Sequence, residues 1–376
     1  MKVLSLFDGM ACGMIAMNLA GVDVESYDAY EIDKYAVKTA QHNFPMIREH
    51  GDVFAADFTQ YEGVDFMVGG SPCTYWSIAQ TKNRETVASG IGWELFSQYV
   101  RALHEAKPKY FIYENNKSMS KEIRASIDKT FGFEAVLINS ALVSAQNRQR
   151  LYWVGKRNAD GTYSKVNVEQ PDDRGILLRD ILETGIAWQE KSYNLTTRCN
   201  GAIPSDTLKR HRHTMVTEPV CVAEPICLNS KGGRGGVEGL QPSLQDCIYS
   251  IDGKHTAVTT GFMPKITQPV PGYATPCEWD ENGKPIKVIS AADGKIYKVY
   301  EVKDGQITIK GKEYPIKLRD GCYLIRKLTV RECMRLQTVP ETYEFLVSNS
   351  QAYKMLGNGW TCEVIAHLIR SALTEE

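Results

Sequence analysis

The chain has 376 residues, of which 43% are hydrophobic and 24% charged, and its formal net charge at pH 7 is −1. This is the composition of an ordinary globular protein with room for a core, and the length suits two domains of roughly 100–200 residues each. No apolar run approaches the roughly 18 residues of a membrane-spanning helix, and the apolar start of the chain is too short for a secretory signal. These features favour a soluble intracellular protein over a membrane or secreted one.

The first 157 residues alternate short apolar runs with helical stretches. We expect strands at 3–7, 24–30, 64–68, 110–113, 135–139 and 151–155, and helices at 12–20, 34–43, 95–106 and 121–131. This rhythm predicts an α/β domain with a mostly parallel, doubly wound sheet that helices cover on both faces. Ligands of such sheets bind beyond the carboxyl ends of the strands.

Residues 158–325 differ in composition and are rich in glycine, proline, threonine and charged residues. Pairs such as Asp304-Gly305 and Asn282-Gly283 mark hairpin turns. We therefore expect a second, smaller, irregular and mainly β domain. Helical character returns over 326–376, with a capped helix at 329–336 and an amphipathic one at 361–373, which we expect to return to the first domain.

Charge is distributed unevenly along the chain. Residues 1–65 carry eleven acidic and four basic residues, a local charge of −7, whereas residues 191–235 carry seven basic and three acidic ones, a local charge of +4. This pattern fits a protein whose acidic first part binds a cofactor and whose basic middle part faces a polyanion. A solvated basic surface without a ligand explains the second segment equally well. The ten cysteines form no Cys-x-x-Cys pair, so no metal site is predicted.

A small-residue turn at 7–13 joins the first expected strand to the first helix. Glycine lets the backbone approach a ligand closely, and the helix N-terminus offers free N–H groups. Glu31 ends the second strand, 22 residues after Gly9, where its carboxylate would bond ribose hydroxyls, and Asp52 follows a third strand. This pattern is typical of both nicotinamide dinucleotide and adenosylmethionine sites, and many such units bind nothing.

Residues 69–77 read Gly-Gly-Ser-Pro-Cys-Thr-Tyr-Trp-Ser and directly follow an expected strand. Cys73 would therefore emerge at the ligand edge of the sheet, behind the stiff Pro72. Since a free thiol has a pKa of about 8.5, a nucleophilic role needs neighbours that favour the thiolate. The alternative is a buried structural cysteine.

Polar residues also follow the later strands of the first domain. Glu114 leaves a buried strand at the same edge, where an unpaired carboxylate would be costly. Arg148 and Arg150 are separated by one residue, so on an extended segment they point the same way and suit a phosphate or carbonyl oxygen. A surface charge pair explains the two arginines equally well.

These motifs, in this order, resemble those of the DNA (cytosine-5) methyltransferase family. The likeness is strong over 1–155 and 326–376, and its motifs lie at 7–13, 70–73, 114–116, 146–150, 331–337 and 356–359. Ala11 and Cys12 stand where the family usually has two glycines. This variant of the first motif, together with the final motif at 357–360, is similar to the motifs of the animal de novo DNA methyltransferases. Thr74 and Asn116 also depart from the usual residues.

The resemblance implies roles for individual residues. It assigns addition to C6 of cytosine to Cys73, contact with N3 and the exocyclic amine to Glu114, contact with O2 to Arg150, and support of the loop or base to Arg148. The cofactor contacts that it implies are Phe7, Asp8, Gly9, Cys12, Glu31, Ile32, Asp52, Leu95, Asn358 and Trp360. The DNA contacts expected from it and from the basic segment are Ser71, Ser77, Lys82, Arg84, Arg198, Arg210, Arg212 and Arg234.

S-adenosyl-L-methionine is the implied cofactor, and a specific duplex DNA sequence, with its target base flipped out, is the implied substrate. A monomer in the cytoplasm of a prokaryotic or virus-infected cell is expected, whereas a cognate restriction endonuclease and the target sequence stay open. Three alternatives remain: a tRNA cytosine-5 methyltransferase, a nicotinamide dehydrogenase, and a catalytically dead DNA-binding regulator. The dehydrogenase leaves Cys73 and Glu114 unexplained, and the intact Cys73, Glu114 and Arg150 disfavour the regulator.

Overall fold

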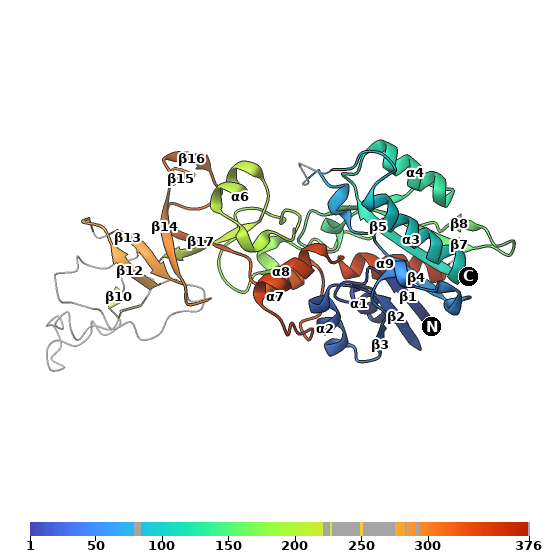
Figure 1. Cartoon of the computed structure of the whole chain (residues 1–376). Coiled ribbons are helices and arrows are strands. Elements are labelled where there is room, and N and C mark those ends of the chain that lie inside the picture. Colours follow the sequence, from blue (N-terminus) through green and yellow to red (C-terminus); the bar gives the residue numbers. More distant parts are fainter. Residues whose placement is uncertain are drawn as a thin grey trace. The chain divides into compact units, whose positions relative to one another are not determined.

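The computed structural model describes residues 1–78, 84–220, 226–227, 249–250, 275–282, 284–290 and 293–374. It divides the chain into two compact units (Figure 1). The first comprises Met1–Leu177, Lys191–Asn200 and Thr329–Glu376, and the second comprises Leu178–Glu190 and Gly201–Leu328. The boundary predicted at residue 157 thus lies inside the first unit. This unit extends twenty residues further, to Leu177, and also includes the later segment Lys191–Asn200.

The first unit contains an eight-stranded sheet with the order β3-β2-β1-β4-β5-β7-β6, to which β8 adds by pairing with β7. The strands are β1 (Lys2–Leu6), β2 (Ser26–Tyr30), β3 (Ile47–Glu49), β4 (Phe66–Gly69), β5 (Tyr110–Asn116), β6 (Val136–Asn139), β7 (Gln149–Arg157) and β8 (Tyr163–Lys165). Neighbours from β3 to β5 run parallel, whereas β7 runs antiparallel to β5, β6 and β8. The mostly parallel sheet expected from the sequence is confirmed.

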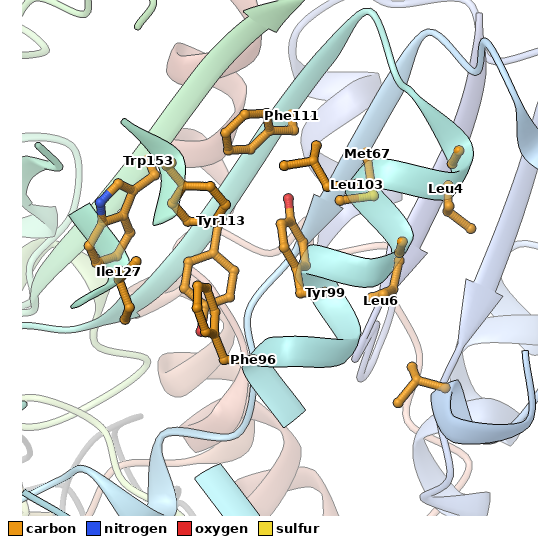
Figure 2. Close-up of a cluster of buried hydrophobic side chains, with 14 of the residues drawn as sticks. Leu4, Leu6, Met67, Phe96, Tyr99, Leu103, Phe111, Tyr113, Ile127 and Trp153 are labelled. Atoms are coloured by element: carbon orange, nitrogen blue, oxygen red, sulfur yellow. The ribbon is translucent and has the colours of Figure 1, made fainter. Parts of the chain in front are cut away.

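The helices of the first unit are α1 (Cys12–Leu19), α2 (Lys34–Asn43), α3 (Ile91–Ala106), α4 (Lys121–Phe131), α7 (Val330–Leu336), α8 (Asn349–Asn358) and α9 (Cys362–Thr374). Figure 2 shows α3 in front of the sheet, with helical ribbon of the C-terminal segment behind it. Phe96 and Tyr99 of α3 are buried against Phe111 and Tyr113 of β5, and Ile127 of α4 joins the same cluster. This aromatic core fixes β4 and β5, the two strands from which Cys73 and Glu114 emerge.

The C-terminal segment, Thr329–Glu376, belongs to the first unit. The Tyr343 hydroxyl donates to the Met10 carbonyl at 2.8 Å, and Lys354 Nζ lies 2.7 Å from Asp33 Oδ2. Helix α7 begins with the predicted cap, because the Thr329 side chain and Glu332 form a reciprocal capping box. The end of the chain is thereby fastened beside the β1–α1 turn.

The second unit is mainly β, as predicted. Its seven-stranded sheet has the order β12-β13-β14-β15-β16, and β17 pairs with both β14 and β9. The elements are α5 (Leu178–Ile181), α6 (Pro204–Arg210), β9 (Met215–Val220), β12 (Thr275–Trp279), β13 (Pro285–Ile289), β14 (Ile296–Lys303), β15 (Gln306–Ile309), β16 (Lys312–Pro315) and β17 (Gly321–Lys327), with β10 (Ile226–Cys227) pairing β11 (Tyr249–Ser250).

One predicted hairpin turn can be followed in detail. Asp304 and Gly305 connect β14 to β15, and both have positive φ, 51° and 69°. This left-handed geometry matches the twist of the flanking strands, which is why an Asp-Gly pair stands there. In the part of the chain that the structure describes, no helix is long and apolar enough to cross a membrane.

Candidate active site

The β1–α1 turn has a tightly wound backbone. Phe7, Gly9 and Ala11 all have positive φ, near 60°, and Ala11 precedes the first residue of α1. A Cβ on Gly9 would meet no neighbour within 4 Å, so glycine is favoured there by conformation and not by space. The Gly9 N–H donates to Glu31 Oε2 at 2.9 Å, which ties this turn to the end of β2.

Among the described residues, the partners of the Glu31 carboxylate are backbone groups. Its second oxygen, Oε1, accepts from the N–H groups of Ile32 and Asp33, each at 2.8 Å. The structure thus brings Glu31 and Gly9, two of the predicted cofactor residues, together.

Asp8 contributes a second carboxylate to this edge of the sheet. Its Oδ1 accepts from the Ser5 and Tyr27 hydroxyls, both at 2.6 Å, whereas Oδ2 is buried with no partner among the described residues. Burial, with a contribution from the Glu31 charge, raises the pKa of Asp8 to about 6. An acid oxygen left without a donor in the protein suits a cationic or hydrogen-bond-donating ligand.

Glu49 is a third carboxylate at this edge, and sequence reasoning missed it. It ends β3, and neither of its buried oxygens has a partner in the described part of the chain. Burial, followed by the charges of Asp8 and Glu31, raises its pKa to about 8. No sequence pattern marked it, because β3 is only three residues long.

Apolar surface lies beside these acids in the chain. Ile32 is 76% exposed and Phe54 is 51% exposed, and Asp52 caps the short turn that contains Phe54, whose N–H it accepts at 3.0 Å. Acidic groups flanked by exposed apolar side chains fit a ligand with a positive charge and a flat heterocycle, such as S-adenosyl-L-methionine.

The remaining predicted cofactor residues lie in different settings. Cys12 is buried at the first residue of α1, and Leu95 is half-buried in α3. Asn358 is exposed at the last residue of α8, and the Trp360 side chain is buried and turned toward Glu114.

Sheet register brings the predicted catalytic residues to one edge. Gly69, the last residue of β4, pairs with Tyr113 of β5, so the turn that carries Cys73 leaves the sheet beside Glu114. On the other side of β5, Asn116 pairs with Arg150 of the antiparallel β7. Three residues far apart in the sequence therefore meet.

Both oxygens of Glu114 have a partner. Arg150 Nε lies 2.9 Å from Oε1, and the Trp360 indole N–H donates to Oε2 at 3.0 Å. All three side chains are largely buried. A Cβ on Gly70 would lie 3.0 Å from Glu114 Oε2 and 2.9 Å from its carbonyl oxygen, so the Gly-Gly pair leaves room for this arrangement.

Cys73 opens a short 3₁₀ turn, Cys73–Tyr75, and is half-buried. Burial raises the pKa of its thiol, and the charge of Glu114 raises it further, whereas the charges of Arg150 and Arg148 lower it. Arg150 is the stronger of the two arginines in favouring the thiolate. The two arginines therefore oppose the effects of burial and of Glu114, but the net pKa of the thiol stays above its usual value.

Arg148 is buried and bonds groups of later segments of the chain, whereas Arg150 contacts Glu114. Its guanidinium donates to the carbonyls of Gly359 at 2.7 Å and Leu195 at 3.2 Å, and to Asn194 Oδ1 at 2.9 Å. Burial, then the charge of Arg150, lowers its pKa to about 10. The structure places this side chain as a brace for the turn that precedes Trp360.

Comparison with known proteins agrees with this geometry. The sequence profile of the C-5 cytosine-specific DNA methylase family matches residues 1–374. The chain belongs to this family. The predicted enzyme class, a DNA cytosine-5 methyltransferase, is confirmed, and the nicotinamide dehydrogenase alternative is wrong.

The methylase is similar along its whole length to phage and bacterial relatives. It is 27% identical to the orphan methyltransferase M.SPRI of Bacillus phage SPR, covering 99% of this chain and 97% of that one. The type II methyltransferase M1.ScrFI of Lactococcus lactis subsp. cremoris is 26% identical over 100% of this chain and 78% of its own. Among solved structures, Dnmt2 of S. pombe shares the fold with a TM-score of 0.51 at 14% identity, over 100% of this chain and 98% of that chain.

The predicted DNA contacts of the methylase lie in several settings. Ser71 is buried, with its hydroxyl 2.6 Å from that of Tyr113. The Ser77 N–H donates to the Cys73 carbonyl at 3.0 Å. Arg84 donates to the Ser118 carbonyl at 2.7 Å and so fastens the segment after Cys73.

The other predicted DNA contacts are basic residues of the middle segment and the loop. Arg198, in the first unit, is exposed. Arg210 and Arg212, in the second, stay more than half-exposed while lying 3.0 and 3.6 Å from Asp206. Lys82 and Arg234 lie outside the described residues.

Proposed function

We propose that this methylase transfers a methyl group from S-adenosyl-L-methionine to C5 of a cytosine in a specific duplex DNA sequence, with Cys73 as the nucleophile. The observation that carries the proposal is the meeting of Cys73, Glu114 and Arg150 at the sheet edge. The unpartnered carboxyl oxygens of Asp8 and Glu49 support the choice of a cationic cofactor. One chain supplies all these groups, so a monomer suffices.

Cys73 is the group that makes C5 reactive. Its thiolate sulfur bonds to C6 of cytosine, and the ring electrons displaced by this addition make C5 nucleophilic. The cofactor, when bound, supplies an electrophilic methyl group on its sulfonium. After transfer, loss of the C5 proton to a base or to water returns the electrons to the ring, and the C6–sulfur bond breaks.

Glu114 and Arg150 accommodate the charge that this addition creates. Glu114 protonates or hydrogen-bonds N3 of the ring and contacts the exocyclic amine, while Arg150 is close enough to Glu114 to bond O2 of the same base. Their mutual contact and that of Trp360 hold both groups in a fixed arrangement before the base arrives, so little reorganisation is required.

Duplex DNA must be locally opened for this chemistry. C5 and C6 of a stacked cytosine cannot reach a thiol at a sheet edge, so the target nucleotide has to leave the helix. We assign recognition of the surrounding sequence to the second unit, where Arg210 and Arg212 are available for phosphates or guanine edges. The relatives include both orphan and type II methyltransferases, so the proposal needs no nuclease partner.

A mechanism-based trap tests the proposal. Fluorine at C5 of the target cytosine removes the departing proton, so the enzyme should stay covalently bound to the DNA when adenosylmethionine is present. Cys73→Ala should abolish both this denaturation-resistant complex and turnover. Cys277→Ala, on β12, and Cys333→Ala, on α7, should preserve both. Trapping that survives Cys73→Ala, with another cysteine on the DNA, would overturn the assignment.

A further inference from the structure

Glu85 is a partly buried acid that connects the turn of the nucleophile with the start of α3. Its Oε2 accepts from the Trp76 indole N–H at 3.0 Å, and its Oε1 accepts from the Gly92 N–H at 3.1 Å. Its own backbone N–H donates to the carbonyl of Tyr75, the last residue of the Cys73–Tyr75 turn, at 2.8 Å. One residue thus fastens the segment that follows Cys73 to a helix of the core.

The backbone around Glu85 leaves room for its carboxylate. A Cβ on Gly90 would lie 2.6 Å from Glu85 Oε1, and a Cβ on Gly92 would lie 2.6 Å from Trp76 Nε1. Glycine at both positions therefore permits the close approach of these two side chains. Gly90 precedes α3 and has no side chain to cap it, so the Glu85 carboxylate accepts in its place, where the helix dipole favours negative charge.

Trp76 links this arrangement to the nucleophile. Its side chain is fully buried, and its ring meets that of Phe96 of α3 edge-on, with 6.5 Å between the ring centroids. Its backbone N–H donates to the Cys73 carbonyl at 3.1 Å. The backbone of Cys73 is therefore held by a residue whose own side chain is fixed by Glu85.

We propose that Glu85 is a positioning residue for Cys73: by holding the Trp76 indole against the start of α3, it keeps the thiol where its sulfur can add to C6. The inference rests on the proposed function, because it takes Cys73 as the nucleophile. A displacement of about 1 Å in a reacting group can slow a step about 100-fold. Loss of Glu85 should therefore slow the addition to C6 and leave the binding of cofactor and DNA nearly unchanged.

The rate at which the covalent complex forms tests the inference. Excess enzyme and adenosylmethionine are mixed with target duplex that carries 5-fluorocytosine, and the denaturation-resistant complex is followed in time. Glu85→Ala and Trp76→Phe each remove the bond between the two side chains and should each slow complex formation about 10- to 100-fold. Because both changes remove one and the same bond, the double variant should be about as slow as the slower single variant. Glu85→Gln, whose amide oxygen can still accept from Trp76, should regain most of the rate.

Ser348→Ala is the matched control, because it also removes a side-chain cap from the start of a helix, α8, and it should keep the wild-type rate. A wild-type rate in Glu85→Ala, a loss of cofactor or DNA affinity as large as the loss of rate, or effects that multiply in the double variant would overturn the role of Glu85. The proposed function would then stand, provided that the wild-type protein still forms its complex through Cys73. A wild-type protein that forms no such complex would overturn both. Should Glu85→Ala fail to fold, Trp76→Phe decides, since a wild-type rate there would refute the inference.

Discussion

Replacing Trp360 with phenylalanine removes one hydrogen bond from Glu114 and keeps an aromatic ring in a buried position. The lost bond is the indole N–H to Oε2, at 3.0 Å, and it leaves Glu114 held by Arg150 alone. Hydrogen bonds to charged groups contribute about 1.5–3 kcal/mol. If this energy is needed to hold Glu114 against the base, the rate of methyl transfer should fall about 10- to 150-fold.

The assay is single-turnover methyl transfer at saturating cofactor and DNA, which separates chemistry from binding and product release. Trp153→Phe is a matched control, because its indole N–H also donates to a carboxylate, Asp128 Oδ1 at 2.8 Å, in the buried core of the same unit. It should lose a comparable amount of stability and keep the wild-type rate. Equal rates for Trp360→Phe and the wild-type protein, or equal rate losses in both variants, would refute the reasoning.

Three further predictions concern pH, a buried arginine and salt. The pKa values of Asp8 and Glu49, about 6 and about 8, lie above the unfolded values of about 3.9 and 4.3. The melting temperature of the ligand-free enzyme should therefore fall as the pH rises from about 5 to about 8, and Glu49→Gln should make this fall smaller. A wild-type melting temperature that does not change over this pH range would contradict the prediction. Arg148→Met removes the hydrogen bonds to the Leu195 and Gly359 carbonyls and should cost about 2–4 kcal/mol of unfolding free energy in urea denaturation, against less than about 0.5 for the exposed Arg179→Met. DNA affinity should fall at least about tenfold between roughly 50 and 200 mM salt, because the +4 segment at 191–235 neutralises phosphates; an equal affinity at both concentrations would count against it.

The sequence predicts most of the first unit, and the reason is physical. Strands buried on both faces appear as continuous apolar runs, and chemically special residues at their carboxyl ends appear as motifs, so Cys73 and Glu114 could be placed on one edge before any coordinates. Arg150 reaches that edge from the start of the antiparallel β7, which no local pattern indicates. Strand β3 is only three residues long with one buried apolar residue, Ile47, so Glu49 carries no periodic signal. Its importance appears only when the neighbouring strands supply Asp8.

Side-chain direction is harder to predict than strand position. Arg148 and Arg150 look equivalent in the sequence, where they stand two residues apart. In the structure, Arg148 donates to the Gly359 and Leu195 carbonyls, whereas Arg150 contacts Glu114. The difference arises from residues 191–200 and the C-terminal segment, whose carbonyls accept from Arg148. Ser71 shows the same effect, since its burial depends on Tyr113 of another strand. Long-range packing, which a local pattern does not contain, determines these outcomes.

The fastening of the chain's end beside its beginning has a consequence for biosynthesis. The contact of Tyr343 with Met10 spans 333 positions, and Trp360 completes a pair whose other member, Glu114, is made much earlier. A nascent chain on the ribosome therefore lacks the hydrogen bond from Trp360 to Glu114 until the 246 residues that follow Glu114 have been translated. Contacts of such long sequence separation also slow folding.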